Sequence, residues 1–84
     1  MKPLRLTDHA EVRLARRGLR RAWVEATARE PEWREPEPSQ PDVERRYRRV
    51  GEAGGRVLRV VCAETDSEIR VITAMLDRNA KAKP

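Results

Sequence analysis

Apolar and polar positions follow a helical period in the first part of this chain. Thr7 or Asp8 offers a helix N-cap, and Asp8 with Glu11 three residues later has the spacing of a capping box. Gly18 follows "LARR" and predicts a left-handed residue that ends the helix, with the arginines suiting the negative end of its dipole. We therefore predict a first helix that begins at residue 7 or 8 and ends before Gly18, after which Leu19 packs back on the core.

The stretch "RRAWVEATAR" predicts a second helix, from Arg20 or Arg21 to Arg29. Pro31 ends this helix, because a proline disfavours the helical conformation of the residue before it. One side of the helix is expected to be the more apolar one and consists of Ala22, Trp23, Ala26 and Thr27.

The segment 31–42 breaks the helical pattern. Four of the six prolines fall within residues 31–41, together with several glutamates. Such a segment is neither a helix nor a central strand, so we predict an extended, polyproline-like connector. Trp33 is expected to be its one covered side chain, because an indole ring gains from contact with the domain.

After this connector the period becomes that of strands. Three stretches, at 42–50, 56–64 and 68–76, are rich in Val, Ile, Tyr and Thr, which favour strands. The turn-like segments "GEAGG" and "TDS" join them, so an antiparallel meander is expected. The predicted fold class is α+β, with two N-terminal helices packed on one face of a three- to four-stranded antiparallel sheet (α-α-β-β-β).

Alternation along each strand predicts which side chains enter the core. The expected sets are Leu58, Val60 and Cys62 in the second strand, Ile69, Val71 and Thr73 in the third, and Val43 and Tyr47 in the first. Cys62 is then a small buried side chain rather than a reactive thiol.

Length and composition limit what the chain can be. Its 84 residues are expected to form one domain over 1–78, with a disordered tail at 79–84. The hydrophobic fraction is only 38%, so a homodimer or another partner is expected to complete the core. No segment has the length of a membrane span and no signal peptide is visible, so we expect no membrane association and a cytoplasmic location. One cysteine and one histidine supply no metal-ligand set, so neither a metal nor another cofactor is expected.

Charge is separated into blocks along the chain. Residues 1–21 carry a net charge of +5, residues 22–44 carry −5, residues 45–59 carry +5, and residues 60–84 are balanced. If the two basic blocks meet in the fold, they form a surface that attracts phosphates. The alternative is that these charges form ordinary surface ion pairs, as in proteins from thermophilic sources.

The only histidine lies on the basic side of the first helix. At about 100° per residue, His9, Arg13, Arg16 and Arg17 fall within an arc of roughly 100°. One reading is an acid/base group within a basic site, and the other is a polar residue that hydrogen-bonds a neighbouring loop.

The stretches "HAEVRLARRGL" (9–19), "GGRVLRVV" (54–61) and "RVITAMLDR" (70–78) resemble a small bacterial domain family of unknown function, over roughly residues 5–78. The family reads as H-A-x-x-R followed by R-G, a strand pair and a closing V-I-T-A strand. Its architecture is similar to that of RelE-like toxins and other metal-independent endoribonucleases. The matching positions are His9, Arg13, Arg17, Gly18 and Thr73, whereas Met75 stands where members usually carry an aromatic residue.

This resemblance implies an RNA-binding or RNA-cleaving, toxin-like module. His9 would be the general base, since the positive end of the helix dipole favours its neutral form, and Arg13 would hold the phosphate. The remaining candidate RNA ligands are Arg16, Arg17, Arg45, Arg46, Tyr47, Arg59 and Thr73. The alternative is a non-catalytic interaction module, in which the same basic groove holds an antitoxin-like acidic protein or the sheet pairs in a homodimer. The two readings differ in whether the His9 and Arg13 side of the helix faces the basic groups of 45–59.

Overall fold

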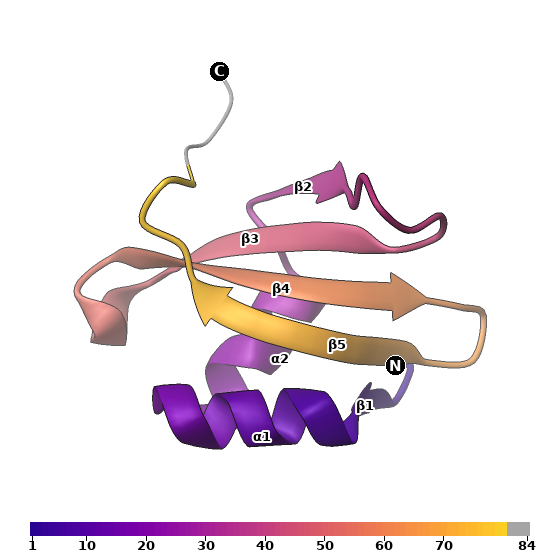
Figure 1. Cartoon of the computed structure of the whole chain (residues 1–84), viewed down its shortest axis with the longest axis horizontal. Coiled ribbons are helices and arrows are strands. Elements are labelled where there is room, and N and C mark those ends of the chain that lie inside the picture. The colour runs from indigo at the N-terminus through magenta and orange to yellow at the C-terminus, as the bar shows by residue number, and fades with distance from the viewer. Residues whose placement is uncertain (81–84) are drawn as a thin grey trace.

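A five-stranded mixed sheet carries both helices on one of its faces in the computed structural model of this chain, which describes residues 1–80 (Figure 1). The strand order is β1-β5-β4-β3-β2. The elements in chain order are β1 (Leu4–Leu6), α1 (Asp8–Arg17), α2 (Arg21–Arg29), β2 (Trp33–Pro36), β3 (Glu44–Val50), the 3-10 turn η1 (Gly51–Ala53), β4 (Arg56–Glu64) and β5 (Ile69–Leu76).

The α+β class is confirmed, but the number and direction of the strands were predicted wrongly. β3, β4 and β5 form the expected antiparallel meander. β1 adds a parallel strand beside β5, in the register Leu4↔Ile69, and β2 adds an antiparallel strand beside β3. A strand of only three residues in front of a helix carries no periodic signal, which explains why β1 was not expected.

The ends of α1 follow the sequence signals. Thr7 is the N-cap, and its hydroxyl accepts a hydrogen bond from the backbone N–H of Ala10 at 3.1 Å. Gly18 adopts the left-handed conformation with φ 64°, and Leu19 is buried beyond it. Asp8 is already the first helical residue, so it is not the cap.

The buried side of α2 matches the predicted one only in part, since Thr27 is buried and Trp23 packs against the core as expected. Val24, Thr27 and Ala28 are fully buried, whereas Ala22 is exposed. The hydroxyl of Thr27 donates to the carbonyl of Trp23 within the same helix, which satisfies this polar group inside the core.

Part of the segment 31–42 is a strand rather than an unpaired connector. β2 lies at the sheet edge, where Pro36 is tolerated because the missing N–H need not join a ladder. Trp33 pairs with Tyr47 across β2 and β3, and the two rings are stacked. The expected cover for Trp33 is therefore the ring of Tyr47.

The core lies between the helices and the sheet. Leu58, Val60 and Cys62 of β4 point into it, as predicted. In β5 a register irregularity separates Val71 from Thr73, so Ala74 rather than Thr73 continues the buried row.

The predicted orientation of β3 is inverted. The register places Arg46 beside Val60, so Arg46 is on the helix side and Tyr47 is on the other face, the open face of the sheet. Arg46 is 4% exposed because its guanidinium donates to the carbonyl of Ala28, to Glu44 and to Glu64. Satisfying these donors is what allows an arginine to occupy an inward position.

Two further expectations concern the chain as a whole. Within residues 1–80, no helix is both long and apolar enough to cross a membrane. Of the tail expected to be disordered, Asn79 and Ala80 form a turn with Asp77, and residues 81–84 lie outside the described residues.

Candidate functional site

Four basic side chains form a row along one flank of α1, which we call the α1 stripe: His9, Arg13, Arg16 and Arg17. His9, Arg16 and Arg17 are exposed, and Arg13 is half-buried. The Nε of Arg13 donates a hydrogen bond to the Nε2 of His9 at 3.3 Å. This contact joins the two residues that the sequence analysis placed at the centre of a site.

The α1 stripe runs beside an unpaired part of β5. β1 pairs with β5 only as far as Val71, so residues 72–76 have no strand on that side in the part of the chain that the structure describes. The Nη1 of Arg17 instead donates to the carbonyl oxygen of Ala74 at 2.8 Å. Arg17 thus connects the stripe to the β5 edge.

The basic residues of the sheet do not join this stripe. Arg45, Tyr47, Arg59 and Thr73 belong to the open face, according to the strand registers. α1 and α2 cover the opposite face, and Arg46 is buried beneath α2. The joint site expected from the two basic blocks is therefore not formed.

Acidic partners neutralise much of the second basic block. Glu37 contacts the Nε and Nη2 of Arg45 at 2.8 and 3.1 Å, and only 14% of its side chain is exposed. Hydrogen bonding to Arg45 lowers the pKa of Glu37, and the same bonds raise the pKa of Arg45. Arg59 pairs with Asp77 at 3.4 Å in a similar way.

The strand order explains these pairs. Part of the acidic block, residues 32–37, lies on and around β2, directly beside β3, which carries the arginines 45–49 of the basic block. Arg49 meets Glu32 and Arg34 meets Glu44 for the same reason. The separation of charge along the sequence therefore becomes compensation in the folded domain.

The α1 stripe is different in this respect. Among residues 1–80, no carboxylate lies within ion-pair distance of Arg13, Arg16 or Arg17. Within the same residues, the side-chain hydrogen-bond partner of His9 is Arg13 and not a carboxylate. Arg48 and Arg56 of the strands also lack such a partner, but they donate to the carbonyls of Glu30 and Ala53. The stripe is distinct because three such arginines lie together on one helix flank.

A small pocket adjoins the stripe and was not predicted. Its volume is about 240 Å³, and it is lined by Arg17, Leu19, Met75 and Leu76. Sequence reasoning missed it because it depends on where β1 ends and on the irregularity in β5, neither of which leaves a local pattern.

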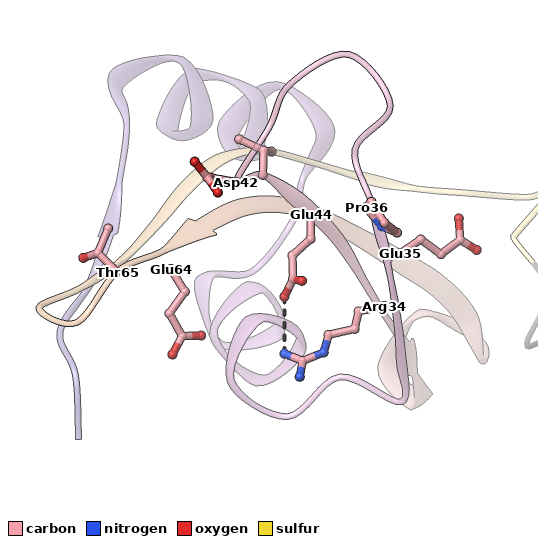
Figure 2. A pocket seen from close by; sticks show the side chains of 8 residues that line it. Arg34, Glu35, Pro36, Asp42, Glu44, Glu64 and Thr65 are labelled. Carbon is pink, nitrogen blue, oxygen red and sulfur yellow. Dashed lines mark hydrogen bonds and ion pairs between the residues drawn. The ribbon is translucent and has the colours of Figure 1, made fainter.

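A second, acidic cavity of about 570 Å³ lies near the β2 edge of the sheet, where β3 begins and β4 ends. Figure 2 shows the carboxylates of Asp42, Glu44 and Glu64 around it, with Arg34 paired to Glu44. These carboxylates do not suit an anion. In residues 1–80 there is also no group of three or more His, Cys, Asp or Glu side chains able to hold a metal ion.

Fold and surface together define a small α+β domain with one uncompensated basic helix flank. Residues 6–76 match the family described as "Domain of unknown function (DUF4258)", and the chain belongs to this family. A search of curated proteins and a search of solved structures found no match.

Proposed function

We propose that this protein binds RNA, and that the α1 stripe holds the sugar-phosphate backbone. The observation that carries the proposal is the clustering of cations without carboxylate partners. Arg45, Arg49 and Arg59 of the sheet face carboxylates, whereas Arg13, Arg16 and Arg17 lie together on one helix flank with none within ion-pair distance. Cations without carboxylate partners are available for phosphates, and their contacts release condensed counterions from the nucleic acid.

The geometry of the stripe suits an extended polyanion. His9, Arg13 and Arg17 are spaced by four residues, so they rise along one side of α1 over about 12 Å. A guanidinium can also bind a phosphate through two parallel N–H donors. RNA is proposed as the polyanion because the sequence motifs of the chain resemble a family whose architecture is expected to be similar to that of RelE-like toxins.

Salt-dependent RNA binding tests this proposal. Fluorescence anisotropy of a labelled single-stranded RNA between roughly 50 and 200 mM salt gives the slope of log affinity against log salt. The double variant Arg13→Gln/Arg16→Gln is expected to reduce this slope by about 1.4, because each lost contact with a single strand is worth about 0.7.

The matched control removes the same charge from paired arginines. Arg45→Gln/Arg49→Gln is expected to leave the slope near the wild-type value, since Glu37 and Glu32 already compensate these side chains. Equal effects of the two double variants would contradict the proposal. Binding of a polyglutamate peptide, without salt-dependent RNA binding, would instead support an acidic protein partner on the same surface.

Cleavage of the bound RNA is a second candidate function, favoured by the contact between Arg13 and His9. The Nε2 of His9 accepts this hydrogen bond and therefore carries the lone pair. A phosphate that draws Arg13 away would free this lone pair next to the RNA backbone.

The reaction that fits this pair is attack by a 2′-hydroxyl. Nε2 takes the 2′-OH proton, the 2′ oxygen bonds to phosphorus, and the 5′ oxygen leaves with a proton from water. Arg13 stabilises the charge that develops on the phosphate. Tyr47 and Arg59, expected to complete such a site, lie on the open face of the sheet, so α1 supplies both groups of this proposal.

A further inference from the structure

The pocket beside the α1 stripe combines apolar walls with one planar cation. Leu19, Met75 and Leu76 supply the apolar walls, and the guanidinium of Arg17 borders them. Its volume of about 240 Å³ is below the roughly 300–1,000 Å³ of pockets that hold drug-sized ligands. The pocket therefore suits a single small ring system.

The edge of β5 creates this pocket. Because β1 ends at Leu6, no strand from residues 1–80 pairs with this side of β5 beyond Val71. Met75 pairs with Arg59 on the open face, whereas Leu76 pairs with Leu58 on the helix side. Side chains from both faces of β5 thus border one opening at the sheet edge.

Two hydrogen bonds restrain side chains that line the pocket. Arg17 is anchored to the carbonyl of Ala74, which leaves its other N–H groups and its flat surface available. Arg59 donates to the sulfur of Met75, which restrains this flexible side chain. The pocket is consequently largely preformed.

We infer that the RNA bound by this protein is single-stranded and that one of its unstacked bases occupies this pocket. The inference rests on the proposed function. It adds that the RNA is single-stranded and that the pocket is the binding site of one base. Unpaired bases commonly stack on arginine planes, whereas a duplex keeps its bases inside. Since Arg17 belongs to both the stripe and the pocket, a strand whose phosphates lie along α1 can reach it with a neighbouring base.

Charge and polarity argue against the other occupant considered above, an acidic peptide. A carboxylate would gain from Arg17 but would lose its hydration against three apolar walls. The flat surface of a base can pack against the apolar walls, and its polar edges can accept hydrogen bonds from the remaining N–H groups of Arg17. The stripe and the pocket together thus fit a nucleotide strand better than an acidic side chain.

Binding of three labelled probes tests the inference. The probes are a short single-stranded RNA, the same strand annealed to its complement, and a ribose-phosphate strand without bases. Met75→Ser is expected to weaken binding of the single strand about tenfold, near the lower end of what one stacked base contributes. Its effect on the duplex and on the strand without bases should stay below about twofold, because their phosphate contacts are unchanged.

Two variants control for folding. Val61→Ser makes a similar change on a half-buried open-face position outside the pocket, and it should leave all three affinities within about twofold. Met75→Leu keeps an apolar wall and should retain single-strand binding. Thermal unfolding of each variant confirms that the domain is intact.

The outcomes separate this inference from the proposed function. If Met75→Ser binds all three probes like the wild type while Arg13→Gln/Arg16→Gln loses RNA binding, the pocket is not a base site although the stripe binds RNA. Equal loss for the duplex and the single strand would also overturn the inference. If the wild type shows no salt-dependent binding to any probe, the proposed function itself fails.

Discussion

The indole of Trp33 stacks on the ring of Tyr47, with centroids 5.0 Å apart and ring planes 7° apart. The pair lies on the open face and joins the edge strand β2 to β3. Tyr47 is only 4% exposed although α1 and α2 cover the opposite face of the sheet. The stack therefore attaches an edge strand that contains a proline and only four residues.

Trp33→Ala is expected to destabilise the domain by about 2 kcal/mol, because it removes partial apolar burial and the ring contact. Urea unfolding measures this change. Trp33→Phe keeps a ring against Tyr47 and should cost less than half as much. A change below about 0.5 kcal/mol for Trp33→Ala would show that β2 is held mainly by its ladder.

Arg46→Ala should destabilise the domain by about 3 kcal/mol, since it leaves the carbonyl of Ala28 and two carboxylates without their shared donor. The matched control is Arg34→Ala, which removes an exposed partner of the same Glu44. Its expected cost is at most about 1 kcal/mol, as for other surface pairs. Similar costs for both variants would contradict the structural role of Arg46.

Stability should fall at acidic pH through Glu64. Hydrogen bonds from Lys2 and Arg46 lower the pKa of this carboxyl from 4.5 to about 2. The unfolded chain takes up the proton below about pH 4.5 whereas the folded chain does not, so stability is lost as the pH falls from about 4.5 to about 2.

Urea unfolding of wild type and Glu64→Gln between these pH values checks this linkage. The variant should be less stable at neutral pH and should lose less stability on acidification. The pKa values of Glu37 and Glu68 are also lowered, by Arg45 and Arg5, so some pH dependence is expected to remain. An unchanged pH profile would mean that the contacts of Glu64 persist in its protonated form.

Gly18→Ala should destabilise the domain by about 1 kcal/mol. An added Cβ would meet no atom within 4 Å, so the cost comes only from the left-handed backbone at φ 64°. Gly51→Ala is the control, because Gly51 has equal space and no positive φ, and it should be neutral or slightly stabilising. Thermal unfolding distinguishes the two, and equal effects would argue against backbone strain.

His9→Asn tests the cleavage hypothesis separately from RNA binding. Asparagine keeps a polar side chain but cannot accept the 2′-OH proton as a base, so cleavage should drop by about 100-fold or more. Affinity for RNA should change little, because the arginines of the stripe remain. Cleavage that is equal in both proteins, or absent in both, would leave binding as the function of the stripe.

Much of the fold was predictable because its signals are local. The cap at Thr7, the stop at Gly18 and the alternation in β4 each depend on a few neighbouring residues. The orientation of β3 was predicted wrongly because an arginine is expected at the surface. The sequence does not show that Ala28, Glu44 and Glu64 surround Arg46 in the fold. The predicted set of buried side chains in β5 was wrong at Thr73, because a register irregularity shifts the alternation by one residue.

Only the part of the candidate site that lies on α1 was predictable from the sequence. Helical spacing identified His9, Arg13, Arg16 and Arg17, and these residues do lie along one flank of α1. Net charge alone could not show whether Arg45 and Arg59 were available. Their availability depends on strand order, which brings Glu37 and Asp77 to them.

The short length of β1 has a consequence for self-association. A strand edge with unsatisfied backbone groups is a template on which other extended chains can add and polymerise. At the exposed edge of β5, the charged side chain of Arg17 binds the carbonyl of Ala74. A longer β1 would have paired with β5 at this position. This protection depends on one side chain, so a variant lacking Arg17 should aggregate more readily even if its core is unchanged.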